Sequence, residues 1–344
     1  MSYLQAIVIA LVQGVTELFP VSSLGHSVIV PAWIGGSWET LVTQSSQGDS
    51  GSSFYLAFIV ALHCATAVAL LWFFRADWVR IIGGFFRSLS RSLRERAFVV
   101  HGADERLAWL IVLATIPVGI TGLALEHVFR TVFAKPMAAS IFLFVNGVIL
   151  LLGERARRRA DDRHAVAEAL GAPVAARASR GGVAVAERQP EGRPIESRSR
   201  GARSADDVEA AVTSDRRIAR MSYGAGLYIG SMQVLALLPG ISRSGVTMVG
   251  GLWRGLSHED AARFAFLLAT PVIFAAGVLK LPSLAGPAGA HIHGQVVVGA
   301  LITGVTAYLS VRFLVRYFET RTLTPFAIYC LVAGAASIAR FAIA

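Results

Sequence analysis

The stretch "QGVTELFPVSSLGHSVIVP", residues 13–31, places polar chemistry inside an apolar region of the chain. It contains a carboxylate at Glu17, two adjacent hydroxyls at Ser22 and Ser23, and an imidazole at His26. The proline that precedes the serines stops or kinks a helix. The stretch therefore predicts a broken helix whose two pieces share a buried polar site.

The whole composition indicates that this broken helix lies in a membrane. Of 344 residues, 54% are hydrophobic and 16% are charged, and the mean hydropathy is +0.59. About 20 helical residues cross a bilayer core. Six apolar runs of 17 to 21 residues fit that length, at 54–74, 107–125, 137–153, 264–281, 295–315 and 325–343. We expect an all-α polytopic membrane protein with six full spans.

The formal charge of +10 is concentrated in one part of the chain. Between Glu154 and Arg220 lie 15 arginines and 11 acidic residues, which are 26 of the 54 charged residues. This segment has no aromatic residue and no sustained apolar period, as in disordered loops. We predict a charged, disordered cytoplasmic loop at 154–220 and no nucleic-acid partner.

The shorter loops predict how the chain is oriented. Residues 75–106 hold seven arginines, and 253–263 and 312–321 are also basic, whereas 32–53 and 282–294 contain no Lys or Arg. Cytoplasmic loops carry the excess of Lys and Arg. The first group is therefore expected in the cytoplasm, and the broken helix should open to the external side of the membrane.

A second segment, "MQVLALLPGISRSG" at 232–245, resembles the first when it is shifted by 220 positions. Gln, Leu, Ser and Gly recur, and in each copy three apolar runs follow the break. An odd number of spans inverts the second copy relative to the first, and inverted repeats place their sites on broken helices near the midplane. Two inverted repeats are predicted, at 1–153 and 221–344, forming one integrated membrane domain. A chance match of two Ser/Gly turns is the alternative.

The two breaks carry complementary groups. Gly240 and Gly245 permit a tight turn in the second tip, Ser242 and Ser244 offer hydroxyls, and Arg243 offers a guanidinium that can hold two phosphate oxygens. In the first tip, the helix N-terminus at Ser22 and Ser23 favours an anion. Irregular backbone at membrane depth must be buried or line a cavity, so the tips are expected to meet.

Helical spacing suggests roles in the first tip. Gln13 and Glu17 share one face of the first piece, and Ser23 and His26 share one face of the second. His26 could take the proton of Ser23 as that hydroxyl attacks phosphorus, while Glu17 holds a divalent cation or orients His26. Direct attack by water activated by His26 is an alternative, and so is a purely structural role as helix caps.

These two motifs resemble those of the undecaprenyl-diphosphate phosphatases, the BacA-type bacitracin-resistance proteins. "QGVTELFPVSSLGH" is similar to their (Glu/Gln)-x-x-x-Glu and P-x-S-S-x-G-H signatures, and "LLPGISRSGVT" is similar to P-G-x-S-R-S-G. The resemblance implies hydrolysis of undecaprenyl diphosphate, which recycles the lipid carrier of peptidoglycan synthesis. It also implies a catalytic set and a neighbouring substrate-binding set, respectively Glu17, Ser23, His26, Arg243 and Gln13, Ser22, Gly240, Ser242, Ser244, Gly245.

The resemblance further implies dependence on Mg²⁺ or Ca²⁺, with Glu17 as a candidate ligand. Gln13 stands where many members have a second Glu, so a site with two acidic ligands is not expected here. Leu24 stands where Thr is frequent, which favours Ser23 as the reactive hydroxyl. His63, within a predicted span, is expected to bond a neighbouring helix.

A transporter or flippase for a polyprenyl phosphate is the alternative function. Inverted repeats with broken helices are typical of secondary transporters, and the Arg243 tip could bind such a lipid without hydrolysing it. A nucleophile close to a base favours the enzyme, because binding alone needs neither. Its lipid partners would be the diphosphate substrate and the surrounding membrane.

Overall fold

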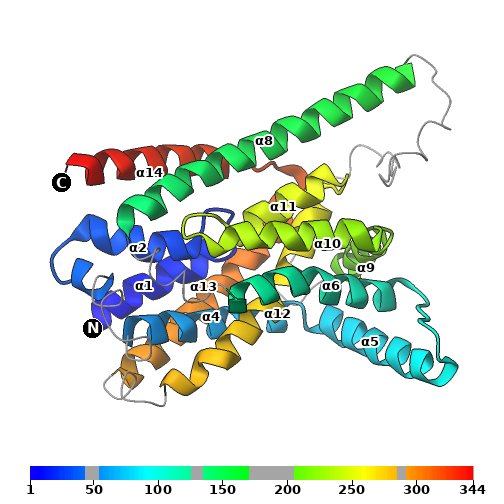
Figure 1. Ribbon diagram of the computed structural model, residues 1–344, viewed down its shortest axis with the longest axis horizontal. Helices are drawn as coiled ribbons and strands as arrows, with labels where there is room; N and C mark the ends of the chain where they lie inside the picture. Colours follow the sequence, from blue (N-terminus) through cyan, green and yellow to red (C-terminus); the bar gives the residue numbers. More distant parts are fainter. Residues whose placement is uncertain (43–53, 125–134, 170–204, 285–291, 344) are drawn as a thin grey trace.

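The computed structural model describes residues 1–42, 54–124, 135–169, 205–284 and 292–343 (Figure 1). None of these residues forms a strand, which confirms the predicted all-α class. In chain order the helices are α1 Tyr3–Thr16, α2 Ser23–Ile34, α4 Phe54–Phe73, α5 Arg75–Glu95, α6 Ala103–Ala124, α8 Pro136–Ala169, α9 Ala205–Ala219, α10 Tyr223–Met232, the 3₁₀ helix η2 Gln233–Leu237, α11 Arg243–Trp253, α12 His258–Leu284, α13 His293–Thr320 and α14 Thr324–Ile343.

Five of the described helices, α6, α8, α12, α13 and α14, are long and apolar enough to cross a membrane. A sixth span is obtained if α4 and α5, which bend by 86° at their junction, are counted together. This range agrees with a polytopic membrane protein. The predicted run at 54–74 corresponds to α4, but the basic segment after it, expected to be a loop, is largely the helix α5.

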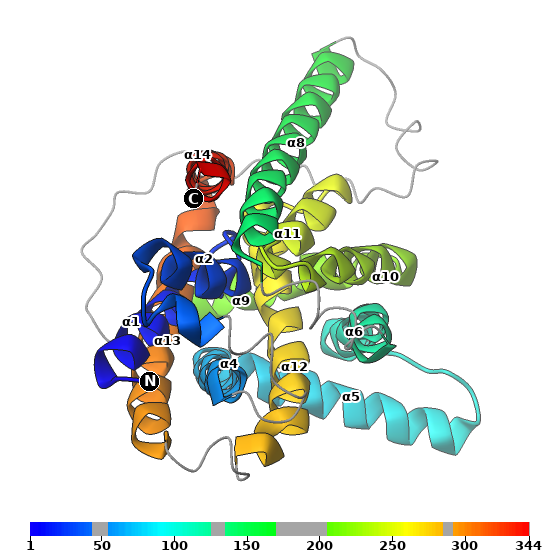
Figure 2. The ribbon, with the colours of Figure 1, turned by 60° about the vertical axis from the view of Figure 1, so that its left-hand side comes forward.

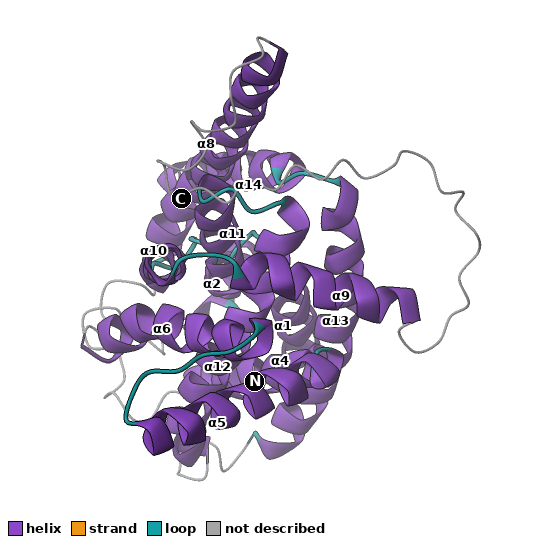
Figure 3. Cartoon of the chain, turned by 90° about the vertical axis from the view of Figure 1, so that its right-hand side faces the viewer, coloured by secondary structure: helices purple, strands orange, loops and turns teal. Residues whose placement is uncertain are grey.

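The long helices pack against one another and against the short ones. α1 packs on α13, α4 packs on both α12 and α13, and α8 packs along α14 (Figures 2 and 3). Small residues allow close contact between α8 and α14, since a Cβ on Gly147 would lie 2.8 Å from the carbonyl oxygen of Ala327. Close approach at small residues is how membrane helices gain packing energy without a hydrophobic driving force.

The segment predicted as a disordered loop, 154–220, is helical at both ends. α8 continues to Ala169, where it projects beyond the other helices (Figure 1), and α9 covers 205–219. Residues 170–204 lie outside the described part of the chain. The prediction of a loop was therefore wrong for the two ends, because the charged composition conceals a buried face of α9 that includes Ser214, Asp215 and Ile218.

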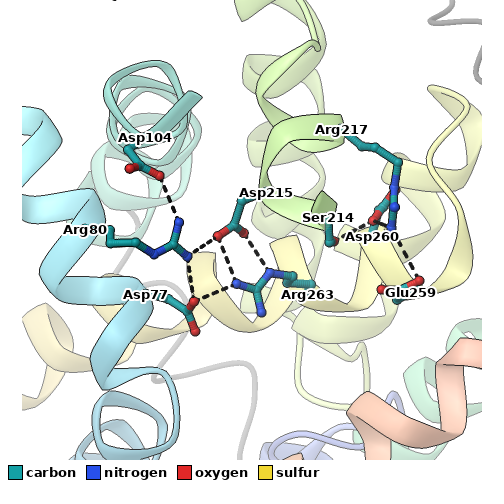
Figure 4. Close-up of polar contacts among 9 residues, drawn as sticks. All are labelled: Asp77, Arg80, Asp104, Ser214, Asp215, Arg217, Glu259, Asp260 and Arg263. Carbon is teal, nitrogen blue, oxygen red and sulfur yellow. Dashed lines mark hydrogen bonds and ion pairs between the residues drawn. The ribbon is translucent and has the colours of Figure 1, made fainter. Parts of the chain in front are cut away.

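α9 is held by buried ion pairs (Figure 4). Asp215 accepts hydrogen bonds from Nε of Arg263 at 2.7 Å and from Nη2 of Arg80 at 2.7 Å. Arg80 also binds Asp77 and Asp104. These contacts tie α9 to α5, α6 and α12, so excision of the whole predicted loop would remove a structural element.

A second group in the same view joins α9 to the start of α12. Arg217 donates to both carboxylate oxygens of Asp260, at 2.7 Å each, and Ser214 donates to Asp260 at 2.5 Å. The hydrogen-bonded Asp260 carboxylate raises the pKa of the Arg217 guanidinium above its ordinary value. Arg217 therefore keeps its positive charge beside the Asp260 carboxylate.

We predict that Asp215→Ala strongly destabilises the protein. Arg263 has a side chain only 6% exposed, and removal of one partner from a buried ion pair costs about 3–5 kcal/mol. Thermal unfolding in detergent should show a clearly lower midpoint for this variant. Asp161→Ala is the matched control, because Asp161 is 54% exposed in its pair with Arg157 and should change the midpoint little. Equal midpoints for the two variants would contradict a structural role for α9.

Candidate active site

Both predicted helix breaks are present. α1 ends at Thr16, a short turn through Pro20 follows, and α2 begins at Ser23 with the side chain of Ser22 as its N-cap. In the second motif η2 leads into a turn, and α11 begins at Arg243. The turns at 17–22 and 238–242, each together with the first turn of the helix that follows, are called the first and second tips below.

The tips touch through glycines and a strained serine. A Cβ on Gly25 would lie 2.8 Å from the Cα of Gly240, so the backbones meet without side chains between them. Ser22 has a φ of 70°, an unusual value for a residue other than glycine. Its Oγ accepts hydrogen bonds from the amides of Gly240, at 3.1 Å, and Gly25, at 3.3 Å. Backbone strain of this kind is typical of functional sites.

Asn146 of α8 clamps the two tips together. Its Nδ2 donates to the carbonyl of Pro20 at 3.0 Å, and its Oδ1 accepts from the amide of Ser242 at 3.0 Å. The side chain is fully buried. One amide thus satisfies a backbone group from each break.

Glu17 lies at the centre of the polar cluster and is buried. Its Oε2 accepts hydrogen bonds from the hydroxyl of Ser23 and from Nε2 of Gln13, the latter at 2.9 Å. His63 Nε2 lies 3.3 Å from the same oxygen. Arg243 Nη2 donates to the other oxygen, Oε1, at 2.8 Å. A hydroxyl, a carboxylate and a guanidinium from both tips therefore converge in one buried place.

Arg243 is held from two sides. Besides Glu17, its Nη1 donates to the carbonyl of Ala269 in α12 at 3.0 Å. A guanidinium has five N–H groups in a fixed fork, so these two bonds leave further donors for a ligand. The side chain is 14% exposed, which makes it the most accessible charge of the pair.

His26 does not contact Ser23 as the spacing predicted. Its Nδ1 lies 2.6 Å from the carbonyl oxygen of Ser22, and its Nε2 lies 2.8 Å from the hydroxyl of Tyr329. Because a carbonyl can only accept, Nδ1 carries the hydrogen and Nε2 accepts from Tyr329. Among the described residues the partner of the Ser23 hydroxyl is Glu17, so the expected pairing of His26 with Ser23 is replaced by a carboxylate–serine pair.

The remaining second-tip candidates form hydrogen bonds within the tips. The hydroxyls of Ser242 and Ser244 lie 3.1 Å apart, and each donates to the carbonyl of Phe19 at 3.4 Å. Ser242 also caps α11 through the amide of Gly245. Gly245 is enclosed, with Leu150 and Pro20 next to its Cα. These residues shape the tip, and their hydroxyls and backbone face the first tip.

The fit of a divalent cation depends on oxygen ligands. Within the described residues no three His, Cys, Asp or Glu side chains are placed to hold one. Gln13 Oε1, however, is buried without a hydrogen-bond partner, beside the Glu17 carboxylate. Mg²⁺ is commonly held by one or two protein oxygens together with substrate phosphates. Gln13 and Glu17 fit that pattern.

Three residues of the site were not assigned there from the sequence. His63 was expected only to bond a neighbouring helix, and its contacts with Glu17 and Gln13 Nε2, the latter at 3.3 Å, confirm that expectation. Asn146 is a lone amide in an apolar run, a signal that could have been used. Tyr329 pairs with a residue 303 positions away, which no local pattern reveals.

Known proteins resemble this chain over almost its whole length. The chain matches the family described as bacitracin resistance protein BacA over residues 6–176 and 198–336. It is 58% identical to undecaprenyl-diphosphatase 2 of Frankia alni over 100% of this chain and 99% of the relative. Identity is 54% to the undecaprenyl-diphosphatase of Mycolicibacterium paratuberculosis, over 98% and 97%. Undecaprenyl-diphosphatase 2 of Chromobacterium violaceum is 36% identical over 97% of each. By this match the chain belongs to the BacA family.

Proposed function

We propose that this protein hydrolyses undecaprenyl diphosphate to undecaprenyl phosphate and inorganic phosphate. The activity recycles the lipid carrier for peptidoglycan synthesis and gives resistance to bacitracin. Relatives more than 50% identical over nearly the whole chain carry the name of this activity. The single structural observation that supports it is the Ser23–Glu17–Arg243 cluster, which joins a hydroxyl, a base and a permanent cation.

In the proposed reaction Ser23 is the nucleophile. Its hydroxyl proton passes to Glu17 Oε2 as Oγ forms a bond to the terminal phosphorus, and the bond from that phosphorus to the bridging oxygen breaks. Undecaprenyl phosphate leaves. Water then attacks the phosphorus of the phosphoserine, the bond from phosphorus to Ser23 Oγ breaks, and inorganic phosphate leaves. Glu17 returns its proton to Ser23 Oγ in this step, which restores the hydroxyl and the carboxylate. Glu17 is already hydrogen-bonded to the hydroxyl it would deprotonate, which satisfies the geometric requirement for a general base.

Arg243 would stabilise the charge on the transferred phosphoryl group. Its remaining N–H donors, and the first-turn amides of α2 and α11 that the caps Ser22 and Ser242 do not bind, are suited to phosphate oxygens. Phosphoryl transfer depends mainly on such positioning and electrostatic stabilisation. Both tips are needed, since Ser23 and Arg243 come from different ones.

His26 is assigned a separate position in the proposal. Its Nδ1 is hydrogen-bonded to the carbonyl of Ser22 and its Nε2 to the hydroxyl of Tyr329, so it is not hydrogen-bonded to the Ser23 hydroxyl. It could activate a water molecule that attacks phosphorus directly, in which case no phosphoserine forms. The two routes differ in which base matters more, Glu17 or His26, and this difference can be measured.

A divalent cation, Mg²⁺ or Ca²⁺, belongs to the proposal through Gln13 Oε1 and Glu17. When bound, the cation would neutralise charge on the diphosphate. Gln13 Nε2 donates to Glu17 and lies near His63, whereas Oε1 has no hydrogen-bond partner among the described residues and is available as a ligand for the cation.

The finer architecture and location are also proposed. α1, α2, α4, α6 and α8 form one repeat, and α10, η2, α11, α12, α13 and α14 form a second, inverted one. The matching breaks and their contact at Gly25 and Gly240 support this division. The Lys/Arg distribution supports a multi-pass protein of the bacterial plasma membrane whose site opens to the external side. The Ser23–Glu17 bond favours hydrolysis over transport of the same lipid.

We predict that phosphate release requires Ser23 and Glu17. The purified protein should release one phosphate per undecaprenyl diphosphate, and Ser23→Ala or Glu17→Gln should lower kcat at least about 100-fold, since general base catalysis contributes 10²–10⁴-fold. His26→Gln should have a smaller effect. Acid quenching should trap a phosphorylated Ser23, identified by mass spectrometry. A larger loss in His26→Gln, without a phosphoserine, would support direct attack by water instead.

Arg243→Lys should lower kcat by at least about 100-fold, although it keeps the charge. A lysine ammonium cannot reproduce the planar fork that contacts Glu17 and Ala269 and still reach a phosphate oxygen. Loss of one such contact is worth about 3 kcal/mol in the transition state. The control is Arg254→Lys on the same helix, where the guanidinium lies over the Tyr228 ring at 4.3 Å. Near-normal turnover in Arg243→Lys would remove the two-tip phosphate site from the proposal.

Gln13→Ala should raise the concentration of Mg²⁺ that gives half-maximal activity by at least about tenfold, the scale seen when a supporting group of a metal site is lost. Gln13→Glu should lower it, because a second carboxylate binds the cation more tightly. Electron paramagnetic resonance of Mn²⁺ with the purified variants measures affinity independently of turnover. An unchanged cation requirement in both variants would exclude Gln13 as a ligand.

A further inference from the structure

α5 has one face that is committed to the protein. Asp77, Ile81, Gly84 and Ser88 are buried along this face. Ser88 Oγ accepts from Nε1 of Trp109 in α6 at 3.1 Å and donates to the carbonyl of Val99 at 2.8 Å. This face therefore packs on the beginning of α6.

A second face of α5 carries large apolar side chains that are largely exposed. Val79, Ile82, Phe86 and Leu93 are 73%, 47%, 61% and 72% exposed. Their spacing of three, four and seven residues places them on a single stripe of the helix. In an aqueous environment this stripe would be costly to expose.

Arginines lie beside this stripe. Arg87 and Arg94, seven residues apart, share one face and are exposed, with the Arg87 side chain 59% exposed. Arg80 and Arg91 point instead to acidic groups of α6, Asp104 and Glu105. Arg87 and Arg94 thus carry exposed guanidiniums next to the stripe, and Arg87 Nε also lies 4.0 Å from Glu105 Oε1.

The bend places α5 across the direction of α4. α4 is apolar and its 20 residues reach about 30 Å, enough for a bilayer core, and the chain then turns by 86°. α5 leaves the bundle at that end and runs to its periphery (Figures 1 and 2). A helix perpendicular to a spanning helix lies in the plane of the membrane surface.

The composition of α5 excludes a spanning role. It contains five arginines and two acidic residues, and an arginine at the centre of a spanning helix costs about 2.5–3.5 kcal/mol. An amphipathic helix with arginines on one side and large apolar groups on the other is typical of the membrane interface. The bent pair is then one span followed by one surface helix.

We propose that α5 is an interfacial helix that binds negatively charged phospholipid, with Val79, Ile82, Phe86 and Leu93 in the acyl region and Arg87 and Arg94 on headgroup phosphates. The basic character of 75–106 places this helix at the cytoplasmic leaflet. Charge complementarity decides between possible occupants: the exposed guanidiniums of Arg87 and Arg94 beside the stripe match an anionic bilayer, and would repel the same face of a second copy.

The site is attached to the rest of the protein by ion pairs. Asp77 and Arg80, on the first turns of α5, bind Arg263 of α12 and Asp215 of α9 (Figure 4). Lipid binding at Arg87 and Arg94 would therefore hold a helix that is already fixed at its other end. It requires no residue of the polar cluster around Glu17, so its test is independent of phosphatase activity.

The test uses the full-length protein reconstituted in phosphatidylcholine bilayers with and without phosphatidylglycerol. Native mass spectrometry counts the lipids that each protein retains. Arg87→Gln/Arg94→Gln should retain at least about threefold less phosphatidylglycerol than the parent, because two positive charges at the anionic surface are lost. Retention of phosphatidylcholine should not change. Arg159→Gln/Arg163→Gln, which removes the same charge from the exposed end of α8, should behave as the parent.

Two results would overturn the proposal. Equal retention of phosphatidylglycerol by the parent and by Arg87→Gln/Arg94→Gln would show that these arginines bind no lipid headgroup. A dimer mass in the parent that is lost in Phe86→Asp would assign the apolar stripe to a second copy of the chain. High salt should abolish the difference between parent and variant if the contact is electrostatic, and a difference unaffected by salt would also count against it.

Discussion

The ion pair between Glu17 and Arg243 is the interaction on which the architecture depends. It joins residues 226 positions apart, at 2.8 Å and away from solvent. Burying two charges is expensive, and their attraction compensates only if the geometry is good and the remaining donors and acceptors are satisfied. Ser23 and Gln13 supply those partners on Glu17, and the carbonyl of Ala269 supplies one on Arg243. The pair therefore forms only when both helix breaks and the start of α11 are correctly positioned relative to one another.

The breaks themselves could be predicted from the sequence, because proline, glycine and serine act locally. Pro20 interrupts the helix, Gly240 adopts a φ of 108°, and Ser22 and Ser242 cap the pieces that follow. Hydropathy also located the long helices, because it too depends only on residues that are close in sequence. Convergence of Glu17, Ser23 and Arg243 followed from the rule that irregular backbone at membrane depth is buried.

Long-range partners could not be predicted in this way. Ser23 and His26 do share a helix, but sharing a helix does not determine which atoms face each other, and His26 is drawn to Tyr329 of α14. The prediction of a disordered loop at 154–220 failed for a different reason. Its average over 67 positions is polar, while the buried face of α9 consists of a few residues at helical spacing, and α5 likewise mixes arginines with an apolar stripe. Averages conceal amphipathic helices.

Asn146 makes the two halves of the site dependent on one side chain. Its Nδ2 donates to the first tip and its Oδ1 accepts from the second tip. A shift of either tip would therefore break one of these two hydrogen bonds. Loss of this one uncharged side chain would therefore release both tips at once and disturb the alignment of Ser23 with Arg243, although Asn146 touches neither of them.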